Sequence, residues 1–168
     1  MPNPKIAIVR ATPSELGLAR QAIAVHLATS HFTGAVDDAA LADFLAHRSH
    51  YLLMAMEGKK IAGSLYGYAL RQPYRREPQF FLYAIDVRPE CRKRGIGTAL
   101  VNQFVREAKR ANACEVWVLT NESNRAAMAM YARAALKRPS TDDAVLVLEF
   151  RASSKPRKSR RISAASGV

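Results

Sequence analysis

Apolar and polar positions follow each other along this chain in a pattern that predicts strands interrupted by helices. Short apolar runs between turn residues favour strands, which we expect at residues 6–9, 51–56, 61–70, 80–87, 115–120 and 144–150. Apolar residues spaced three or four apart favour helices, which we expect at residues 13–27, 37–46, 97–110 and 124–135. Interleaved strands and helices indicate an α/β protein.

Two of these segments carry further local signals. At the first helix, Thr12 suits the N-cap, Pro13 suits the first helical position, and Glu15 completes a capping box. The strand at 80–87 is a nearly unbroken apolar and aromatic run, as expected of a central strand that is covered on both faces. Asp86 is the only charged residue in that run, which makes it a candidate catalytic residue.

The composition narrows the class of protein. A chain of 168 residues with 49% hydrophobic and 24% charged residues is typical of one soluble globular domain. No apolar run approaches the roughly 20 residues of a membrane span, and the N-terminus has no signal-peptide pattern. Cys91 and Cys114 are too few for a disulfide framework or a metal site. We therefore expect a cytoplasmic protein with no metal and no membrane contact.

The net charge of +12 is unevenly distributed. Residues 151–168 hold six of the 26 Lys and Arg residues and no acid, which leaves 20 basic against 14 acidic residues, or +6, in residues 1–150. The Ser- and Ala-rich end cannot build a core. We expect one domain at 1–150 and a basic, disordered tail at 151–168. The tail either only aids solubility or makes a weak contact with nucleic acid.

A glycine-containing loop joins the strand at 80–87 to the next helix. The N-terminus of a helix presents unpaired backbone N–H groups and the positive end of the helix dipole. Gly95 and Gly97 let the backbone approach a ligand closely, because neither has a Cβ. Three adjacent cations precede them, namely Arg92, Lys93 and Arg94. The loop therefore predicts a cradle for a pyrophosphate.

Other phosphate-binding loops fit this segment less well. A P-loop requires Gly-Lys-Ser/Thr at the start of the helix, which is absent. The run from Gly95 to Leu100 lacks the last glycine of a dinucleotide fingerprint and lies late in the chain. The remaining alternative is that the glycines serve helix packing alone.

Two motifs in order resemble the GNAT superfamily of N-acetyltransferases. The first is Arg-x-x-Gly-x-Gly, which begins at Arg92, after an apolar strand that ends in Val. The second resembles the family pattern Asn-x-x-Ala-x-x-Leu-Tyr and runs from Asn124 to Tyr131. The resemblance covers residues 4–150. It implies a mixed, mostly antiparallel sheet of six to seven strands with about four helices, and acetyl-CoA as the co-substrate.

The resemblance also implies roles for individual residues. The backbone of Ile85 and Val87 is expected to pair with the pantetheine arm as if it were an extra strand, and Asn124 to lie near the lower pantetheine. Tyr131 is expected to protonate the departing thiolate; the alternative is a core tyrosine. The residues whose amides are expected to hold the pyrophosphate are Arg92, Lys93, Arg94, Gly95, Ile96, Gly97 and Thr98.

Asp86 has two interpretations. Beside the expected thioester it could act as a general base, directly or through water, and take a proton from the ammonium group of the substrate. Alternatively, it is a carboxylate held by a neighbouring arginine such as Arg88, or one that points into solvent.

The acceptor is suggested by a closer resemblance to the gentamicin 3-N-acetyltransferase subgroup, the AAC(3)-I type, in residues 37–45, 80–87 and 118–124. That subgroup implies the 3-amino group of an aminoglycoside. Because aminoglycosides are polycations, the candidate substrate-binding carboxylates are Asp37, Asp38 and Glu122. Subgroup members usually have an acid after the strand tyrosine, where this chain has Ala84.

Three functions remain open from the sequence. The first is a small-molecule amine acetyltransferase. The second is a protein or peptide acetyltransferase that acts on a lysine or an N-terminus. The third is a non-catalytic module that binds acetyl-CoA. Members of the superfamily often form homodimers, so a homodimer is an expectation from the resemblance as well.

Overall fold

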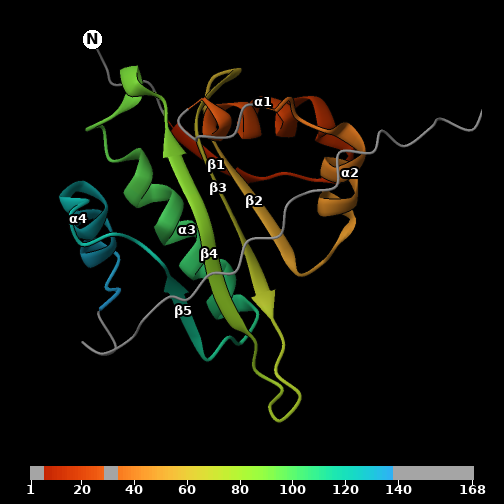
Figure 1. Ribbon diagram of the computed structural model, residues 1–168, viewed down its shortest axis with the longest axis vertical. Coiled ribbons are helices and arrows are strands. Elements are labelled where there is room, and N and C mark those ends of the chain that lie inside the picture. The colour runs from red at the N-terminus through yellow and green to blue at the C-terminus, as the bar shows by residue number, and fades with distance from the viewer. Residues whose placement is uncertain (1–5, 29–33, 138–168) are drawn as a thin grey trace, which may run out of the picture. The chain divides into compact units, whose positions relative to one another are not determined.

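The computed structural model describes residues 6–28 and 34–137. They contain a five-stranded sheet in the order β1-β2-β3-β4-β5 (Figure 1). Its strands are β1 (Ile6–Arg10), β2 (His50–Glu57), β3 (Lys60–Leu70), β4 (Gln79–Val87) and β5 (Glu115–Val118). The first four pair antiparallel, and β5 pairs parallel to β4. The expectation of a mixed, mostly antiparallel sheet is therefore confirmed.

The expected number of strands is not matched. The described residues form five strands rather than six to seven. The predicted strand at 144–150 lies outside the described residues, and β5 ends at Val118 instead of residue 120.

The described residues also form four α-helices, in agreement with the expectation of about four. They are α1 (Leu16–Leu27), α2 (Asp38–Ala46), α3 (Ile96–Arg110) and α4 (Arg125–Arg133). Pro13–Glu15 and Pro89–Cys91 are short 3-10 turns, η1 and η2. Within the described ranges, none of the helices has the length and apolar character needed to span a membrane.

The first helix begins differently from its sequence pattern. Residues Pro13–Glu15 form a separate 3-10 turn before α1 instead of its first turn. The expected capping box between Thr12 and Glu15 is present at this turn, and in it the Glu15 carboxylate accepts a hydrogen bond from the Thr12 backbone N–H at 3.0 Å.

The sheet is covered on both faces, because its central strands are apolar on both sides. Along β2, Leu52 and Met54 pack with α1 and α2, whereas Leu53 and Ala55 pack with α3. Successive side chains of a strand point to opposite faces, so a strand apolar at every position needs helices on both. Figure 1 shows α1 and α2 on one side of the sheet and α3 on the other, with α4 beside α3.

β4 and β5 remain paired over only part of β4. β5 pairs with residues 79–82, and β4 then continues to Val87 with β3 as its only strand partner in the described chain (Figure 1). The β3–β4 register shifts here, so that Tyr66 and Gly67 oppose Ala84 and Leu82 and leave Tyr83 as an extra residue. Such a bulge bends its strand. The sheet is therefore open beside the last residues of β4.

Candidate active site

A cavity of about 620 Å³ lies at this opening. The last residues of β4, the loop that leads into α3, and one face of α4 line it. It brings together nearly all of the residues predicted to bind the cofactor or act in catalysis, namely Ile85, Asp86, Val87, Arg92, Lys93, Gly95, Ile96, Gly97, Thr98, Asn124 and Tyr131. The remaining one of that set, Arg94, is not part of the lining.

The β4 edge forms one wall of the cavity. Residues 84–87 pair with β3 on one side, and no strand of the described residues covers their other side. An uncovered strand edge presents backbone N–H and C=O groups that an extended ligand can pair with. The Val87 carbonyl also accepts a hydrogen bond from Arg92 Nε at 3.1 Å, which ties the start of the loop to the strand.

The two glycines of the loop have different roles. Gly95 is the N-cap of α3 and has a left-handed φ of 78°, which residues with a Cβ rarely adopt. A Cβ at Gly95 would meet no atom within 4 Å, so its surroundings are open. A Cβ at Gly97 would lie 2.6 Å from the Met130 sulfur, so Gly97 allows α3 and α4 to pack closely. Helix packing thus explains Gly97 but not Gly95.

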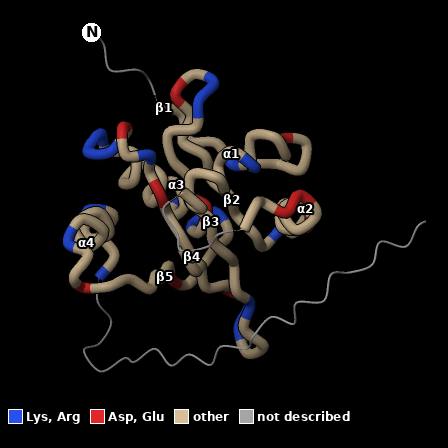
Figure 2. Tube along the Cα trace, turned by 45° about the horizontal axis from the view of Figure 1, so that its top comes forward, with Lys and Arg blue, Asp and Glu red and all other residues tan. Residues whose placement is uncertain are grey.

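The three adjacent cations of the loop lie in different surroundings, because Arg94 does not line the cavity with Arg92 and Lys93. Arg94 forms an ion pair with Glu57 at 2.5 Å, and this contact joins the loop to the end of β2. The hydrogen bond from Arg94 lowers the pKa of the Glu57 carboxyl below its usual value. Arg92 and Lys93 line the cavity, and Arg133 of α4 adds a third cation to the lining. Figure 2 shows Lys and Arg positions in the loop before α3 and on α4.

Asn124 marks the start of α4. Its side-chain oxygen accepts a hydrogen bond from the Ala127 backbone N–H at 3.1 Å, so it caps the helix. The residue also lines the cavity. An N-cap of this kind fixes the position of α4 relative to the loop before it.

Tyr131 lies on α4 and is only 8% exposed. Burial, together with the nearby negative charge of Asp86, raises the pKa of the Tyr131 hydroxyl above its ordinary value. The tyrosine therefore stays protonated at neutral pH. A neutral, buried hydroxyl at the wall of a cavity is a competent proton donor.

Asp86 forms an ion pair with His26 of α1, a residue that the sequence did not single out. Asp86 Oδ2 lies 2.5 Å from His26 Nδ1, and the two side chains are 19% and 24% exposed. Both line the cavity. Arg88, which the sequence suggested as a partner of Asp86, donates from Nε to the Ile61 carbonyl at 2.6 Å.

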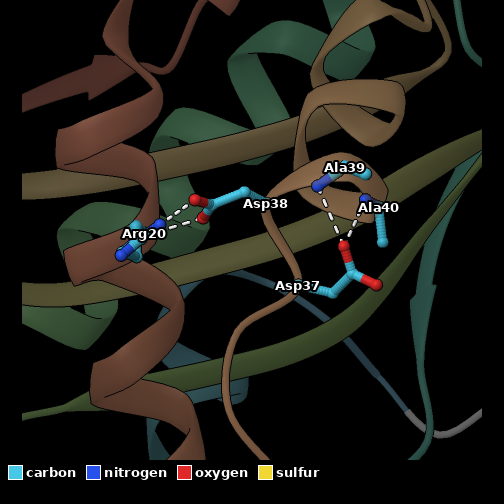
Figure 3. Close-up of polar contacts among 5 residues, drawn as sticks. All are labelled: Arg20, Asp37, Asp38, Ala39 and Ala40. Carbon is cyan, nitrogen blue, oxygen red and sulfur yellow. Dashed lines mark hydrogen bonds and ion pairs between the residues drawn. The ribbon is translucent and has the colours of Figure 1, made fainter. Parts of the chain in front are cut away.

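The proposed substrate carboxylates lie outside this cavity. Asp37 caps α2 by accepting hydrogen bonds from Ala39 N at 2.9 Å and Ala40 N at 3.1 Å, and Asp38 forms an ion pair with Arg20 of α1 (Figure 3). Glu122 is exposed in the loop after β5. The two aspartates, which the sequence proposed as substrate ligands, thus have oxygen atoms that hold the start of α2, and Asp37 also lines a second cavity.

A second, aromatic cavity of about 270 Å³ lies between α1, α2 and β3. Phe44, Tyr66 and Tyr68 line it with the aliphatic side chains Ile23 and Leu41. Tyr66 also has its ring centroid 5.5 Å from that of His26 and 5.2 Å from that of Tyr83, both of which line the first cavity. Tyr66 therefore stands between the two cavities.

The open β4 edge, the left-handed glycine at the start of α3 and the buried tyrosine on α4 all line the one cavity. The sequence profile of the acetyltransferase (GNAT) family matches residues 21–135, and the chain belongs to this family. Acetyltransferases of this family use acetyl-CoA. No curated protein matches the sequence.

Several solved structures share the fold. An aminoglycoside acetyltransferase from an uncultured soil metagenomic sample, in complex with trehalose, has a TM-score of 0.75 at 21% identity, over 88% of this chain and 97% of that chain. AAC(6')-Iy in complex with the bisubstrate analogue CoA-S-monomethyl-acetylneamine has a TM-score of 0.69 at 19% identity, over 88% and 99%. A ribosomal-protein-alanine N-acetyltransferase from Brucella melitensis biovar Abortus 2308 has a TM-score of 0.66 at 17% identity, over 87% and 100%.

Proposed function

We propose that this protein transfers an acetyl group from acetyl-CoA directly to a primary amine. The observation that carries the proposal is the single cavity that joins the β4 edge, the cradle at the start of α3, and Tyr131. The cradle at the start of α3 would bind the pyrophosphate, the β4 edge would pair with the pantetheine, and Tyr131 would lie at the thioester.

The donor-binding residues follow from the lining. The amides at the start of α3 would hold the pyrophosphate, with added charge from Arg92 and Lys93. The backbone at Ile85 and Val87 would pair with the pantetheine. The open surroundings of Gly95 leave room for the phosphates. These assignments support a coenzyme A thioester as the ligand, because no shorter phosphate ester would use both the cradle and the strand edge.

Direct transfer requires little chemistry from the protein. A thioester is already activated, so the protein has to place the amine, polarise the carbonyl and move protons. Tyr131 would donate a proton to the departing thiolate, a role that suits a hydroxyl whose pKa is raised by burial.

The 3-amino group of an aminoglycoside is the acceptor that the AAC(3)-I resemblance suggests. The fold shared with aminoglycoside acetyltransferases is in keeping with it. The cavity lining supports an aminoglycoside less well. Among the described residues of the cavity wall, Asp86 is the one carboxylate, beside the three cations Arg92, Lys93 and Arg133. A polycation binds best where several carboxylates gather. We therefore propose a primary amine as the acceptor class and include an aminoglycoside in its test.

The test is a panel of amines assayed for release of free CoA thiol. The panel contains gentamicin, an aromatic alkylamine and a lysine-containing peptide, and mass spectrometry identifies the acetylated product. We expect thiol release that depends on both acetyl-CoA and one class of amine. Acetyl-CoA binding without thiol release for any amine would contradict the enzyme proposal and favour a binding module.

A further inference from the structure

Three titratable side chains from three separate elements form part of the wall of the donor cavity. His26 comes from α1, Asp86 from β4 and Tyr131 from α4, and all three line the cavity. His26 Nδ1 lies 2.5 Å from Asp86 Oδ2. Burial raises the pKa of Tyr131, and the negative charge of Asp86 raises it further.

The position of α1 against β3 is fixed by a buried hydrogen bond. The Ser64 hydroxyl donates to the Ala22 carbonyl at 2.8 Å, and Ser64 is the cross-strand partner of Asp86. Ala22 lies one helical turn before His26. The bond therefore holds the helix at the height where His26 reaches Asp86.

The contact with Asp86 selects one tautomer of His26. When Nδ1–H donates to the carboxylate, the lone pair of the neutral imidazole is on Nε2. A carboxylate in this position also stabilises the imidazolium that forms when Nε2 accepts a proton. Of the two groups, a neutral imidazole is in general the better proton acceptor near neutral pH.

We propose that His26 is the catalytic base that removes the ammonium proton of the acceptor, and that Asp86 is a positioning residue that holds and charges the imidazole. This inference rests on the proposed acetyl transfer and deepens it. It also changes the sequence-based hypothesis, in which Asp86 was the base.

The proton and bond changes balance as follows. His26 Nε2 takes one proton from the acceptor ammonium group, and the freed nitrogen lone pair forms a C–N bond to the acetyl carbonyl carbon. The C–S bond breaks, and the Tyr131 hydroxyl gives its proton to the thiolate. The second proton of the nitrogen returns to Tyr131 as the amide forms, and His26 releases its proton to water. The sum is one amide, one thiol and one proton from an ammonium ion and a thioester.

Other titratable groups lie near His26. In the described residues the titratable groups facing it are Asp86 on β4 and Tyr66 on β3, with Tyr131 on α4 beyond Asp86. Burial is the main cause that raises the pKa of Tyr66, so this ring stays neutral, and Asp86 supplies the charge.

The test compares His26→Gln with wild type on two amines that the enzyme accepts. One is an alkylamine, protonated at pH ~7 because its pKa is about 10. The other is a weakly basic amine that is already neutral. We expect His26→Gln to lower kcat/KM by about 10²-fold for the alkylamine and by much less for the neutral amine. The wild-type pH profile of kcat/KM for the alkylamine should contain an inflection that His26→Gln lacks.

Two further variants separate the base from a structural role. His47→Gln changes an exposed histidine at the end of α2 and should leave both rates unchanged. Asp86→Asn should also lower kcat/KM more for the alkylamine than for the neutral amine, because the carboxylate that holds the imidazole is lost. Thermal unfolding and CoA binding of each variant check that the fold is retained.

Each possible result either supports or contradicts the role of His26 as the base. Equal losses for both amines, or an unchanged pH profile in His26→Gln, would overturn His26 as the base and leave the acetyltransferase proposal intact. Absence of turnover in the wild type with any amine would overturn both. Loss confined to the protonated amine, with an intact profile in His47→Gln, supports the inference.

Discussion

The surroundings of Tyr131 change the acidity of its hydroxyl. The side chain belongs to the main core cluster, yet it lines the donor cavity. Burial and the charge of Asp86 both disfavour the phenolate. The sequence placed this tyrosine through a motif match, whereas its neighbours and its raised pKa follow from the packing of α4 against the sheet.

Replacement of Tyr131 by Phe should lower kcat by about 10²-fold, because the hydroxyl that protonates the thiolate is lost while the ring still packs. CoA affinity, measured by calorimetry, should stay near wild type. Because the Tyr131 pKa is raised above 10, wild-type activity should not fall through ionisation of this residue below pH ~10. Tyr74→Phe, at a tyrosine that is 73% exposed, is the matched control. An equal loss in both variants would contradict the role.

His26 marks the limit of what the sequence could predict at this scale. Asp86 stood out as the one charge in an apolar strand, but its partner lies 60 positions away along the chain. Nothing local distinguishes His26 from the other histidines, since the contact depends on how α1 crosses the sheet. In the same way, the engagement of Asp37 and Asp38 at the start of α2 depends on cap geometry and on Arg20.

At the scale of elements, the loop between β4 and α3 lines the donor cavity and is also attached to the end of β2 by an ion pair. Its residue types predicted a cradle, and Arg92, Lys93 and Gly95 do line the cavity. The sequence could not show that Arg94 is paired with Glu57, because that contact joins the loop to a strand end 37 positions earlier. The helix at 97–110 was predicted to within one residue, since its apolar stripe is long and regular.

The ion pair predicts equal effects of two variants. If Arg94 only fastens the loop, Arg94→Ala and Glu57→Ala should each weaken CoA binding by a similar factor of about five or less, and the double variant should be no worse. The lowered Glu57 pKa means that the pair contributes above the ordinary carboxyl range and is lost as the pH falls through the lowered value. A much larger loss in Arg94→Ala, measured by calorimetry, would show that the guanidinium contacts the ligand.

The bulge between β3 and β4 predicts a stability difference between two glycines. A Cβ at Gly67 would lie 2.4 Å from the Phe81 carbonyl oxygen and 2.7 Å from the buried Phe104 ring, so Gly67→Ala should destabilise the fold by about 1–3 kcal/mol. A Cβ at Gly17 in α1 meets nothing within 4 Å, so Gly17→Ala should stabilise it by about 0.4–1 kcal/mol. Urea unfolding measures both, and equal effects would contradict the packing at the bulge.

At the scale of the whole molecule, function depends on where the sheet stops being paired. Residues of β4, the loop before α3, and α4 come together because β5 leaves β4 after residue 82. The interleaved pattern of strands and helices predicted the α/β class and most element positions. It could not predict the opening, because strand order and register arise from long-range pairing rather than from local periodicity.

The central claim is that the thioester donor binds between β4 and α4. The most direct test is a calorimetric titration of CoA into the wild type, Ala126→Trp and Ala132→Trp. Both alanines are exposed on α4, but only Ala126 lines the cavity. The wild type and Ala132→Trp should bind CoA with similar affinity, and Ala126→Trp should lose binding because its indole fills the space. Equal binding by all three proteins, or no binding by the wild type, would contradict the placement of the donor.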